Sequence, residues 1–430
     1  MRPKSTRFSP FRLIPLLALF ASCHTASSYT SELLEKSALE RTAKINAVIA
    51  EADIPNIILG YVTRDGATEF LAHGSLSSED PTPVDEDTLY MIASMTKAVT
   101  ATAALQLVEA GDVALDDPLE EVFPELREVK ILEDDGTSRT PNGAITLRHL
   151  LSHTSGFAYF FTSPAIAKSL QFDPSNGFPL AEEIPEGQYD WGFGVQPRRI
   201  FDAGEDWVYG RGVGVAGRVI ERLSGEDLDT YTKANIFAPL GMSRTGYNVS
   251  PELMTQLAPL HLRSPLTGEL SILPSMRPAR LERFYGGGDL LSTPRDYATF
   301  LRCMLNGGTL EGEQILSPES VELFFSNQLP AGVMVQMDPM EGVEAGGRRT
   351  FQGDYDDKFS LAWALEVGSE DGLRSEGAGY WSGIYNTYYT IDKERGFAVF
   401  AFSQLMPFDD PEVYELFRTY EDLVYRNTED

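Results

Sequence analysis

The placement of strand-forming residues along the chain constrains its fold more than any other feature. Near the N-terminus, the stretches 56–66 and 67–76 are typical of two strands joined by a hairpin turn. Near the C-terminus, the stretches 385–392 and 397–404 form a second pair of this kind. The residues between about 118 and 280 are instead rich in proline, glycine and polar loops, with short helices. One antiparallel sheet assembled from both ends of the chain, with the middle inserted beside it, is the simplest packing.

We therefore expect an α+β fold organised in two regions. Residues 30–118 together with 281–430 are predicted to form a domain with an antiparallel sheet, and residues 119–280 a mainly helical insertion beside it. A chain of 430 residues is long enough to bury a large core in this arrangement. A functional cleft is expected where the two regions meet. Helices that cover the sheet are predicted at 30–52, 294–306 and 411–426.

The first residues have the composition of an export leader. Basic residues precede the apolar run 13–20, which is too short to span a bilayer. We expect residues 1–22 to be a signal peptide that is removed, and the protein to be periplasmic or extracellular. The small residues directly before Cys23 also look like a bacterial lipoprotein leader, in which this cysteine is acylated and holds the protein at a membrane. Simple secretion and lipidation at Cys23 both stay open.

The acidic charge excludes several classes of partner. The chain has 64 acidic and 35 basic residues, and a net charge of -29 repels the phosphates of nucleic acids and of anionic lipids. Of its two cysteines, Cys23 lies in the leader and Cys303 lies on the apolar side of a predicted helix. These cysteines provide neither a disulfide framework nor a metal cluster, so no metal ion and no cofactor is expected.

Three further patterns indicate packing rather than chemistry. The G-x-G-x-x-G pattern at 212–217 follows a polar, turn-rich segment instead of the apolar strand that dinucleotide binding requires. We interpret its glycines as positions of close packing. His149 and His153 lie four residues apart on a predicted helix without a carboxylate or cysteine close by in the sequence, so we expect packing and hydrogen-bonding roles. Gly156 is predicted to end that helix.

A serine and a lysine lie three residues apart at the start of the apolar segment 91–111. On a helix, Ser94 and Lys97 share one face. A serine hydroxyl is a poor nucleophile unless a base takes its proton, and a lysine is such a base only when burial or a nearby cation lowers its pKa. The apolar neighbours of Lys97 favour this, but a capping serine beside a surface lysine is an equally open interpretation.

Four other motifs decide between these interpretations. They follow Ser94 in the order "ITLRHLLSHTSGF", "WVYGRGVGVAGRVIERLSG", "YGGGDLLSTPRDYATFL" and "GAGYWSGIYNTYYTID". With these motifs, the chain resembles the β-lactamase-related serine hydrolases, which include class C β-lactamases, D-alanyl-D-alanine carboxypeptidases and esterases. The resemblance extends from about residue 40 to residue 405. It implies a β-lactamase/transpeptidase-like fold.

The resemblance also implies roles for individual residues. Ser94 is the nucleophile that accepts the acyl group, and Lys97 is its proton acceptor or electrostatic partner. Tyr209 protonates the leaving group and later activates water. The backbone N–H groups of Ser94 and Ile384 form the oxyanion hole, a feature whose single donors typically contribute about 10²–10³-fold in rate.

Two positions depart from the lactamase pattern. Arg211 stands where asparagine usually contacts the substrate amide, and it is either a substrate-binding cation or a solvent-facing charge on a loop. The third motif begins with Trp381 instead of lysine or histidine, and Ser382 and Gly383 complete it. An indole carries no charge and is a poor anchor for a carboxylate. The esterase branch shares this Trp-x-Gly form, so neutral esters are expected to be better substrates than β-lactams.

The sequence thus predicts an exported serine hydrolase that forms an acyl-enzyme and hydrolyses small-molecule esters. A penicillin-binding D,D-peptidase or weak β-lactamase acting on acyl-peptides is the alternative within the same chemistry. An acyltransferase is a further alternative, because an alcohol can replace water in the second step. A non-catalytic homologue that binds the cell wall belongs to a different class, and an intact Ser94, Lys97 and Tyr209 set argues against it.

Overall fold

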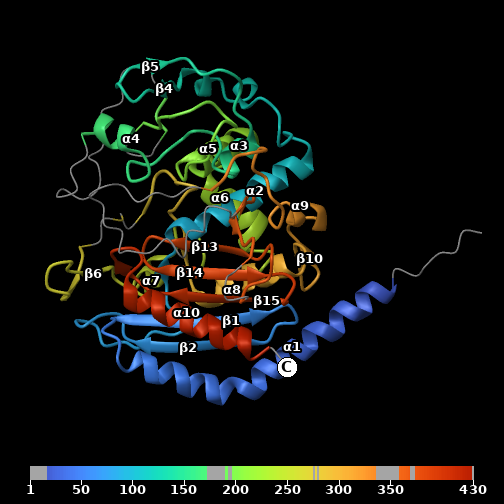
Figure 1. Cartoon of the computed structure of the whole chain (residues 1–430), viewed down its shortest axis with the longest axis vertical. Coiled ribbons are helices and arrows are strands. Elements are labelled where there is room, and N and C mark those ends of the chain that lie inside the picture. The colour runs from blue at the N-terminus through green and yellow to red at the C-terminus, as the bar shows by residue number, and fades with distance from the viewer. Residues whose placement is uncertain are drawn as a thin grey trace, which may run out of the picture.

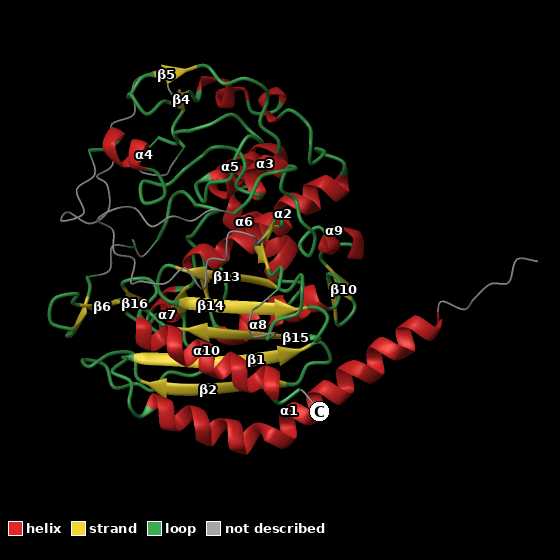
Figure 2. Cartoon of the chain, in the orientation of Figure 1, coloured by secondary structure: helices red, strands yellow, loops and turns green. Residues whose placement is uncertain are grey.

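A seven-stranded antiparallel sheet forms the centre of the molecule (Figure 2). The computed structural model describes residues 17–171, 189–191, 196–274, 277, 280–335, 358–368 and 373–428. The strand order is β11-β12-β13-β14-β15-β1-β2. Its strands are β1 (Asn56–Thr63), β2 (Thr68–Gly74), β11 (Lys358–Phe359), β12 (Ala364–Leu365), β13 (Gly379–Gly383), β14 (Thr387–Asp392) and β15 (Phe397–Phe402).

The sheet joins the two ends of the chain, as the sequence predicted. β1 pairs with β15 in antiparallel register, with Ile58 opposite Phe402 and Thr63 opposite Phe397. Both strands are continuous apolar runs and are buried along their whole length, which is the pattern of a strand covered on two faces. The two predicted hairpins are confirmed. The second of them starts at Thr387 rather than at residue 385, because Asn386 adopts a turn conformation with φ of 60°.

Helices cover both faces of this sheet (Figure 1). The ring of Tyr388 stacks on Phe417 of α10 (Pro411–Arg426), whereas the next residue, Tyr389, contacts Tyr297 of α8 (Pro294–Leu305). Successive side chains of a strand point to opposite faces, so α10 and α8 lie on opposite sides of the sheet. Both helices were predicted within a residue of their observed bounds. Cys303 lies fully buried in α8, as expected.

The middle of the chain forms short elements above the sheet. Among the described residues, 119–280 contribute no strand to the seven-stranded sheet. The limits of the two predicted domains themselves stay a prediction. Besides α1, the other α-helices in the described part of the chain are α2 (Thr96–Ala110), α3 (Leu147–Leu151), α4 (Pro164–Ser169), α5 (Gly212–Ser224), α6 (Leu228–Thr232), α7 (Pro251–Met254) and α9 (Pro318–Glu322). The remaining strands are β3 (Tyr90–Met91), β4 (Ile131–Leu132), β5 (Ser138–Arg139), β6 (His261–Arg263), β7 (Leu270–Ile272), β8 (Leu291–Ser292), β9 (Thr309–Leu310), β10 (Glu313–Gln314) and β16 (Leu405–Met406).

The first helix, α1 (Leu17–Ile49), runs along the sheet edge formed by β2, and its N-terminal turns extend beyond the rest of the molecule (Figure 1). The buried guanidinium of Arg41 fixes it to the sheet through an ion pair of 2.7 Å with Glu69 of β2. The predicted leader, residues 1–22, falls mainly outside the described residues. Along the part of the chain that is described, no helix is both long and apolar enough to cross a membrane.

Candidate active site

Ser94 lies in a single turn of 3-10 helix, Ala93–Met95, between β3 and α2. Ala93 has a φ of 44°, in the left-handed region that non-glycine residues rarely adopt. Neighbouring segments hold this turn in place: the Ile92 N–H donates to the carbonyl oxygen of Leu290, and the Tyr297 hydroxyl donates to the carbonyl oxygen of Met95. The nucleophile candidate is thus presented by a strained turn that packing maintains.

The structure brings Ser94, Lys97 and Tyr209 together at hydrogen-bond distances. The Lys97 amine lies 3.0 Å from Ser94 Oγ, and the Tyr209 hydroxyl lies 2.7 Å from the same oxygen. Lys97 sits in the first turn of α2, a helix that is buried on nearly all sides. Tyr209 lies in the loop before α5, three residues ahead of the first helical residue, Gly212. Lys97 and Tyr209 are both buried, and Ser94 is half-buried.

Burial changes the acid–base properties of this group. It lowers the pKa of Lys97 well below the ordinary lysine value, and the positive charge of Arg211 lowers it further. Burial raises the pKa of Tyr209, although hydrogen bonds with Ser94 and Trp381 offset part of that increase. The arrangement therefore favours a neutral amine beside a protonated phenol. A neutral amine can accept the Ser94 proton, and the phenol can give its proton to a leaving group.

Two tyrosines to which the sequence assigned no catalytic role complete the surroundings of the amine. Tyr159 OH lies 3.3 Å from Lys97 Nζ and 2.7 Å from Tyr285 OH. Tyr159 comes two residues after "HTSGF", and Tyr285 is the first residue of "YGGGDLL". Lys97 also donates to the carbonyl oxygen of Gly287, at 2.7 Å. Only the fold brings these positions to the amine, so the motifs alone do not reveal them.

Arg211 lies on the side of these tyrosines. It is half-buried at the start of α5, with its guanidinium carbon 5.6 Å from the ring centre of Tyr159 and 5.9 Å from that of Tyr285. The glycines of α5 act as packing positions, as interpreted. At Gly214, for example, an added Cβ would lie 2.8 Å from Tyr285 Cδ2. The structure thus places the Arg211 cation near Lys97 rather than out on a solvated loop.

Trp381 forms an apolar wall beside Tyr209. The two ring centres are 5.0 Å apart, and Trp381 also contacts Phe359 at 5.3 Å. Trp381, Ser382 and Gly383 are the last three residues of β13, and the following strand, β14, begins at Thr387. Because side chains alternate along a strand, Ser382 points to the face opposite Trp381. The roles of these residues in substrate binding stay predictions.

The end of β13 lies against the turn that holds Ser94. A Cβ added to Gly383 would lie 2.5 Å from the carbonyl oxygen of Ile92 and 3.2 Å from the Cβ of Ala93. Only glycine allows this approach. Ile384, half-buried, is the next residue. The structure therefore brings the backbones of Ser94 and Ile384 to neighbouring segments, and the oxyanion hole itself stays a prediction.

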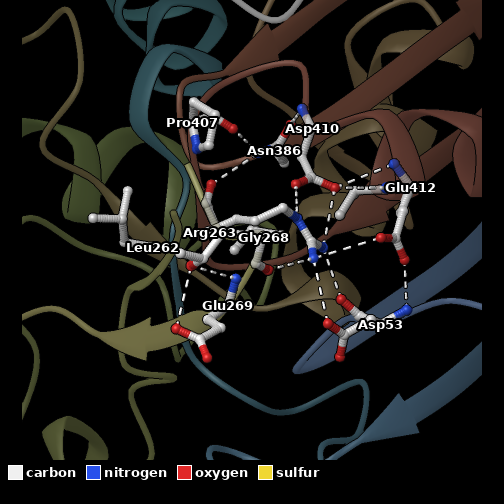
Figure 3. Close-up of polar contacts among 12 residues, drawn as sticks. Asp53, Leu262, Arg263, Gly268, Glu269, Asn386, Pro407, Asp410 and Glu412 are labelled. Atoms are coloured by element: carbon white, nitrogen blue, oxygen red, sulfur yellow. Dashed lines mark hydrogen bonds and ion pairs between the residues drawn. The ribbon is translucent and has the colours of Figure 1, made fainter. Parts of the chain in front are cut away.

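Asn386 fixes the turn that carries Ile384. Its side-chain amide donates to the carbonyl oxygens of Leu405 and Pro407, both at 2.8 Å, and its Oδ1 accepts from the Asp410 N–H at 3.1 Å. Figure 3 shows that Asp410 in turn binds Arg263, at 2.6 Å. This network ties the turn between β13 and β14 to the start of α10.

The segment after α3 supports the Tyr209 loop. The prediction that Gly156 ends this helix is wrong: α3 ends at Leu151, and His153 makes the left-handed turn with a φ of 61°. Gly156 is needed elsewhere, because a Cβ there would collide with the carbonyl oxygen of Phe201. His149 Nδ1 accepts from the Thr146 N–H, and His153 Nδ1 accepts from the Gly210 N–H, both at 3.3 Å. The predicted packing and hydrogen-bonding roles of both histidines are confirmed.

Metal chemistry has no donor set in the described part of the chain, where no three histidine, cysteine or carboxylate side chains gather as a metal site would require. Ser94, Lys97 and Tyr209 are a set of groups suited to acyl transfer.

Comparison with known proteins identifies the family. The Beta-lactamase family profile matches residues 43–419. A monacolin J acid methylbutanoyltransferase from Aspergillus terreus is 31% identical over 361 residues, which cover 80% of this chain and 83% of that protein. A lovastatin esterase from Penicillium rubens is 29% identical over 409 residues, covering 90% of this chain and 95% of the esterase. The solved structure of a simvastatin synthase from Aspergillus terreus superimposes with a TM-score of 0.76 at 27% identity, covering 90% of this chain and 98% of that one. The chain therefore belongs to the β-lactamase family, with the β-lactamase/transpeptidase-like fold that its motifs predicted, and is a serine hydrolase or acyltransferase of that family.

Proposed function

We propose that the protein hydrolyses carboxylic esters of small molecules through an acyl-enzyme formed on Ser94. The observation that carries this proposal is that both the Lys97 amine, at 3.0 Å, and the Tyr209 hydroxyl, at 2.7 Å, lie within hydrogen-bond distance of Ser94 Oγ. A serine hydroxyl that contacts both a neutral amine and a phenol has the base and the acid that acyl transfer requires.

In the first step, Ser94 Oγ attacks the ester carbonyl carbon and its proton passes to the Lys97 amine. Backbone N–H groups of Ser94 and Ile384 stabilise the oxyanion that forms. The bond between the acyl carbon and the alcohol oxygen then breaks, and the alcohol oxygen takes the proton of the Tyr209 hydroxyl. The Lys97 ammonium then gives a proton back to the Tyr209 oxygen. In the second step, water attacks the acyl carbon and gives a proton to the amine–phenol pair. That proton returns to Ser94 Oγ as the carboxylic acid leaves.

The preference for neutral esters rests on Trp381. Its buried indole lies against the Tyr209 ring, where a lysine or histidine would offer a charge or a polar group to a substrate carboxylate. An apolar wall favours acyl or alcohol groups without charge. Arg211 is the cation that we consider for binding a substrate carboxylate. It lies beside the Tyr159 ring, and its charge lowers the pKa of Lys97. Substrates that carry a carboxylate are therefore expected to depend on Arg211.

Transfer of the acyl group to an alcohol is the second candidate, and the relatives favour it. One of them is a methylbutanoyltransferase and another is an esterase. The same acyl-enzyme serves both reactions, which differ only in whether an alcohol or water attacks it.

The deciding experiment is steady-state kinetics of the purified protein with a short-chain p-nitrophenyl ester and with a chromogenic cephalosporin. An added small alcohol, with ester products followed by mass spectrometry, separates transfer from hydrolysis. We expect ester turnover that Ser94→Ala abolishes, with little cephalosporin cleavage. Cephalosporin turnover as fast as ester turnover would instead indicate the penicillin-recognising alternative. The absence of Ser94-dependent turnover on every substrate would contradict the proposal.

Two further variants test the assigned roles. Tyr209→Phe removes only the hydroxyl and is expected to lose most of kcat, whereas Tyr231→Phe, a buried tyrosine on α6, is the matched control. Trp381→Lys is expected to shift the preference toward esters that carry a carboxylate. An unchanged ratio of kcat/KM between charged and neutral esters would show that residue 381 does not contact the substrate.

We also propose that the protein is exported, on the basis of the basic and apolar composition of residues 1–22. The test is expression of the full chain in a bacterial host, followed by fractionation and mass analysis of the mature N-terminus. Cleavage before Cys23 with an added lipid mass would establish lipidation, and cleavage without it simple secretion. An uncleaved cytoplasmic protein would contradict export.

A further inference from the structure

His153 occupies a costly position beside the Tyr209 loop. It is 1% exposed, its φ of 61° lies in the left-handed region, and its Nε2 has no hydrogen-bond partner among the described residues. A buried ring nitrogen without a partner and a strained backbone both oppose folding, so their combination requires an explanation.

The hydrogen bonds that His153 forms with the Tyr209 loop explain this position. Its carbonyl oxygen accepts a hydrogen bond from the Val208 N–H at 3.0 Å, and its Nδ1 accepts one from the Gly210 N–H at 3.3 Å. One residue thus binds the backbone on both sides of Tyr209. The carbonyl oxygen of Tyr209 itself accepts from the Thr162 hydroxyl at 2.7 Å.

From these two hydrogen bonds around Tyr209, and resting on the proposed function, we infer that His153 is a positioning residue that holds the Tyr209 hydroxyl at hydrogen-bond distance from Ser94 Oγ. The ring contributes as well, because its centre lies 4.8 Å from that of Tyr209. Trp207 and Phe359 pack edge-on against the same imidazole, at 6.1 and 5.2 Å. Tyr209 therefore has little freedom to turn away from Ser94.

Gly210 allows His153 to accept hydrogen bonds from the backbone on both sides of Tyr209. A Cβ at this position would lie 2.6 Å from the carbonyl carbon of Phe157, so the loop can approach the segment after α3 only with glycine here. The approach brings the Gly210 N–H to the imidazole. The Gly204 N–H and the Ile200 N–H donate to the carbonyl oxygens of Thr154 and Gly156, which extends the same contact between the two segments.

The arrangement fixes the protonation state of the ring. Nδ1 accepts a hydrogen bond only when it carries no proton, so the proton resides on Nε2. Burial lowers the pKa of His153 well below its ordinary value. His153 therefore stays neutral and takes no part in proton transfer. Its unpaired Nε2–H faces aromatic surroundings, where a second polar partner is absent from the described residues.

The test compares two substitutions at this position. His153→Asn keeps an acceptor at the position of Nδ1, and asparagine tolerates a positive φ. His153→Ala removes the acceptor. We expect His153→Ala to lose about tenfold to a hundredfold in kcat with little change in KM, and His153→Asn to restore most of that loss. His149→Asn, in the same motif but bound to Thr146, is the control that leaves kcat unchanged.

A second measurement does not depend on how the variants fold. Side-chain ¹⁵N NMR of the wild-type protein, which has only five histidines, is expected to show His153 as the neutral Nε2–H form between about pH 5 and 8. A proton on Nδ1, or titration in this range, would overturn the inference. So would His153→Asn as impaired as His153→Ala, or His153→Ala with wild-type kcat. If the wild type shows no Ser94-dependent turnover, the proposed function fails, and the NMR result still decides whether Nδ1 is an acceptor.

Discussion

The side-chain amine of Lys97 donates a hydrogen bond to the carbonyl oxygen of Gly287, with 2.7 Å between the two atoms. A carbonyl oxygen only accepts hydrogen bonds, so one amine hydrogen is directed away from Ser94. Burial lowers the pKa of Lys97 and favours the neutral amine. The amine then retains a lone pair for the Ser94 proton.

This geometry predicts that proton acceptance, rather than charge, is what Lys97 contributes. We expect Lys97→Arg and Lys97→Met both to lose about 10²–10⁴-fold in the rate of Ser94 acylation, because neither side chain accepts a proton. Intact-protein mass spectrometry after mixing with an ester measures that rate. Lys44→Met, which removes an exposed lysine paired with Glu40 on α1, is the control. A Lys97→Arg enzyme with the wild-type rate would show that a positive charge suffices.

Arg211 is expected to set the acidic limb of the pH profile. The pKa of Lys97 is lowered first by burial and then by the positive charge of Arg211. Activity is lost as the pH falls through the Lys97 pKa, because the amine becomes protonated. Arg211→Gln removes the cation and raises that pKa, so the acidic limb of kcat/KM moves to higher pH. Arg211→Lys keeps the charge and should keep the wild-type profile. If Arg211→Gln leaves the limb in place, the two residues are not coupled.

The contact of Gly383 with the Ser94 turn predicts a strong effect of one methyl group. A Cβ at 383 would lie 2.5 Å from the carbonyl oxygen of Ile92, so Gly383→Ala must displace the end of β13 from the nucleophile. We expect a loss of about a hundredfold in kcat. Gly288→Ala adds the same group where the nearest atom is 3.7 Å away, and should have little effect. Equal kcat values for the two variants would remove the role given to this contact.

The side-chain hydrogen bonds of Asn386 fix the turn that carries Ile384. This predicts that Asn386 acts through its side chain. Asn386→Gly suits the φ of 60° and deletes the side-chain hydrogen bonds with Leu405, Pro407, Asp410 and Tyr388. We expect kcat to fall about tenfold to a hundredfold while KM changes little, since a looser turn misplaces the Ile384 N–H. Asn306→Gly, at an exposed asparagine that also donates to two carbonyl oxygens, is the control. An Asn386→Gly protein with unchanged kcat would mean that other contacts hold the turn.

Long, regular patterns made much of the fold predictable from the sequence. The helix at 411–426 was found because its apolar face repeats over four turns, and the strands at both ends because their apolar runs are continuous. The strands β11 and β12 have two residues each, too few to show a period. Ser94 and Lys97 were found together because three residues separate them on one helical surface.

Residues brought to the site only by the fold were not predictable in the same way. Tyr159 reaches Lys97 from 62 positions away, and Tyr285 reaches Tyr159 from 126. Gly156 was misassigned because glycine is the usual left-handed residue after a helix. Here His153 takes that conformation, which brings its imidazole under the Tyr209 loop.

Glu421 predicts how the fold responds to charge removal and to acid. It is fully buried and binds Arg374 through both carboxylate oxygens, at 2.9 and 3.1 Å, between α10 and the sheet. Burial by itself raises the pKa of Glu421, but Arg374 and Arg418 hold it below the ordinary value. Glu421→Gln removes the carboxylate that binds Arg374 through both oxygens and leaves the buried guanidinium with Glu366, 3.8 Å away, as its carboxylate partner. Breaking a buried ion pair typically costs about 3–5 kcal/mol. Asp422→Asn breaks an exposed pair with Arg426 in the same helix and should cost under about 1 kcal/mol.

The lowered pKa of Glu421 also predicts the direction in which the stability of the fold changes with pH. Because the pKa of Glu421 is lower in the folded than in the unfolded protein, its contribution is fully present above the unfolded value of about 4.3 and is lost as the pH falls through the folded value. Urea unfolding at neutral pH and at progressively lower pH measures both effects. Wild type is expected to lose its advantage over Glu421→Gln as the pH falls, since protonation of Glu421 removes the charge that the variant lacks at every pH. A Glu421→Gln protein as stable at neutral pH as Asp422→Asn would show that the buried pair contributes nothing to folding.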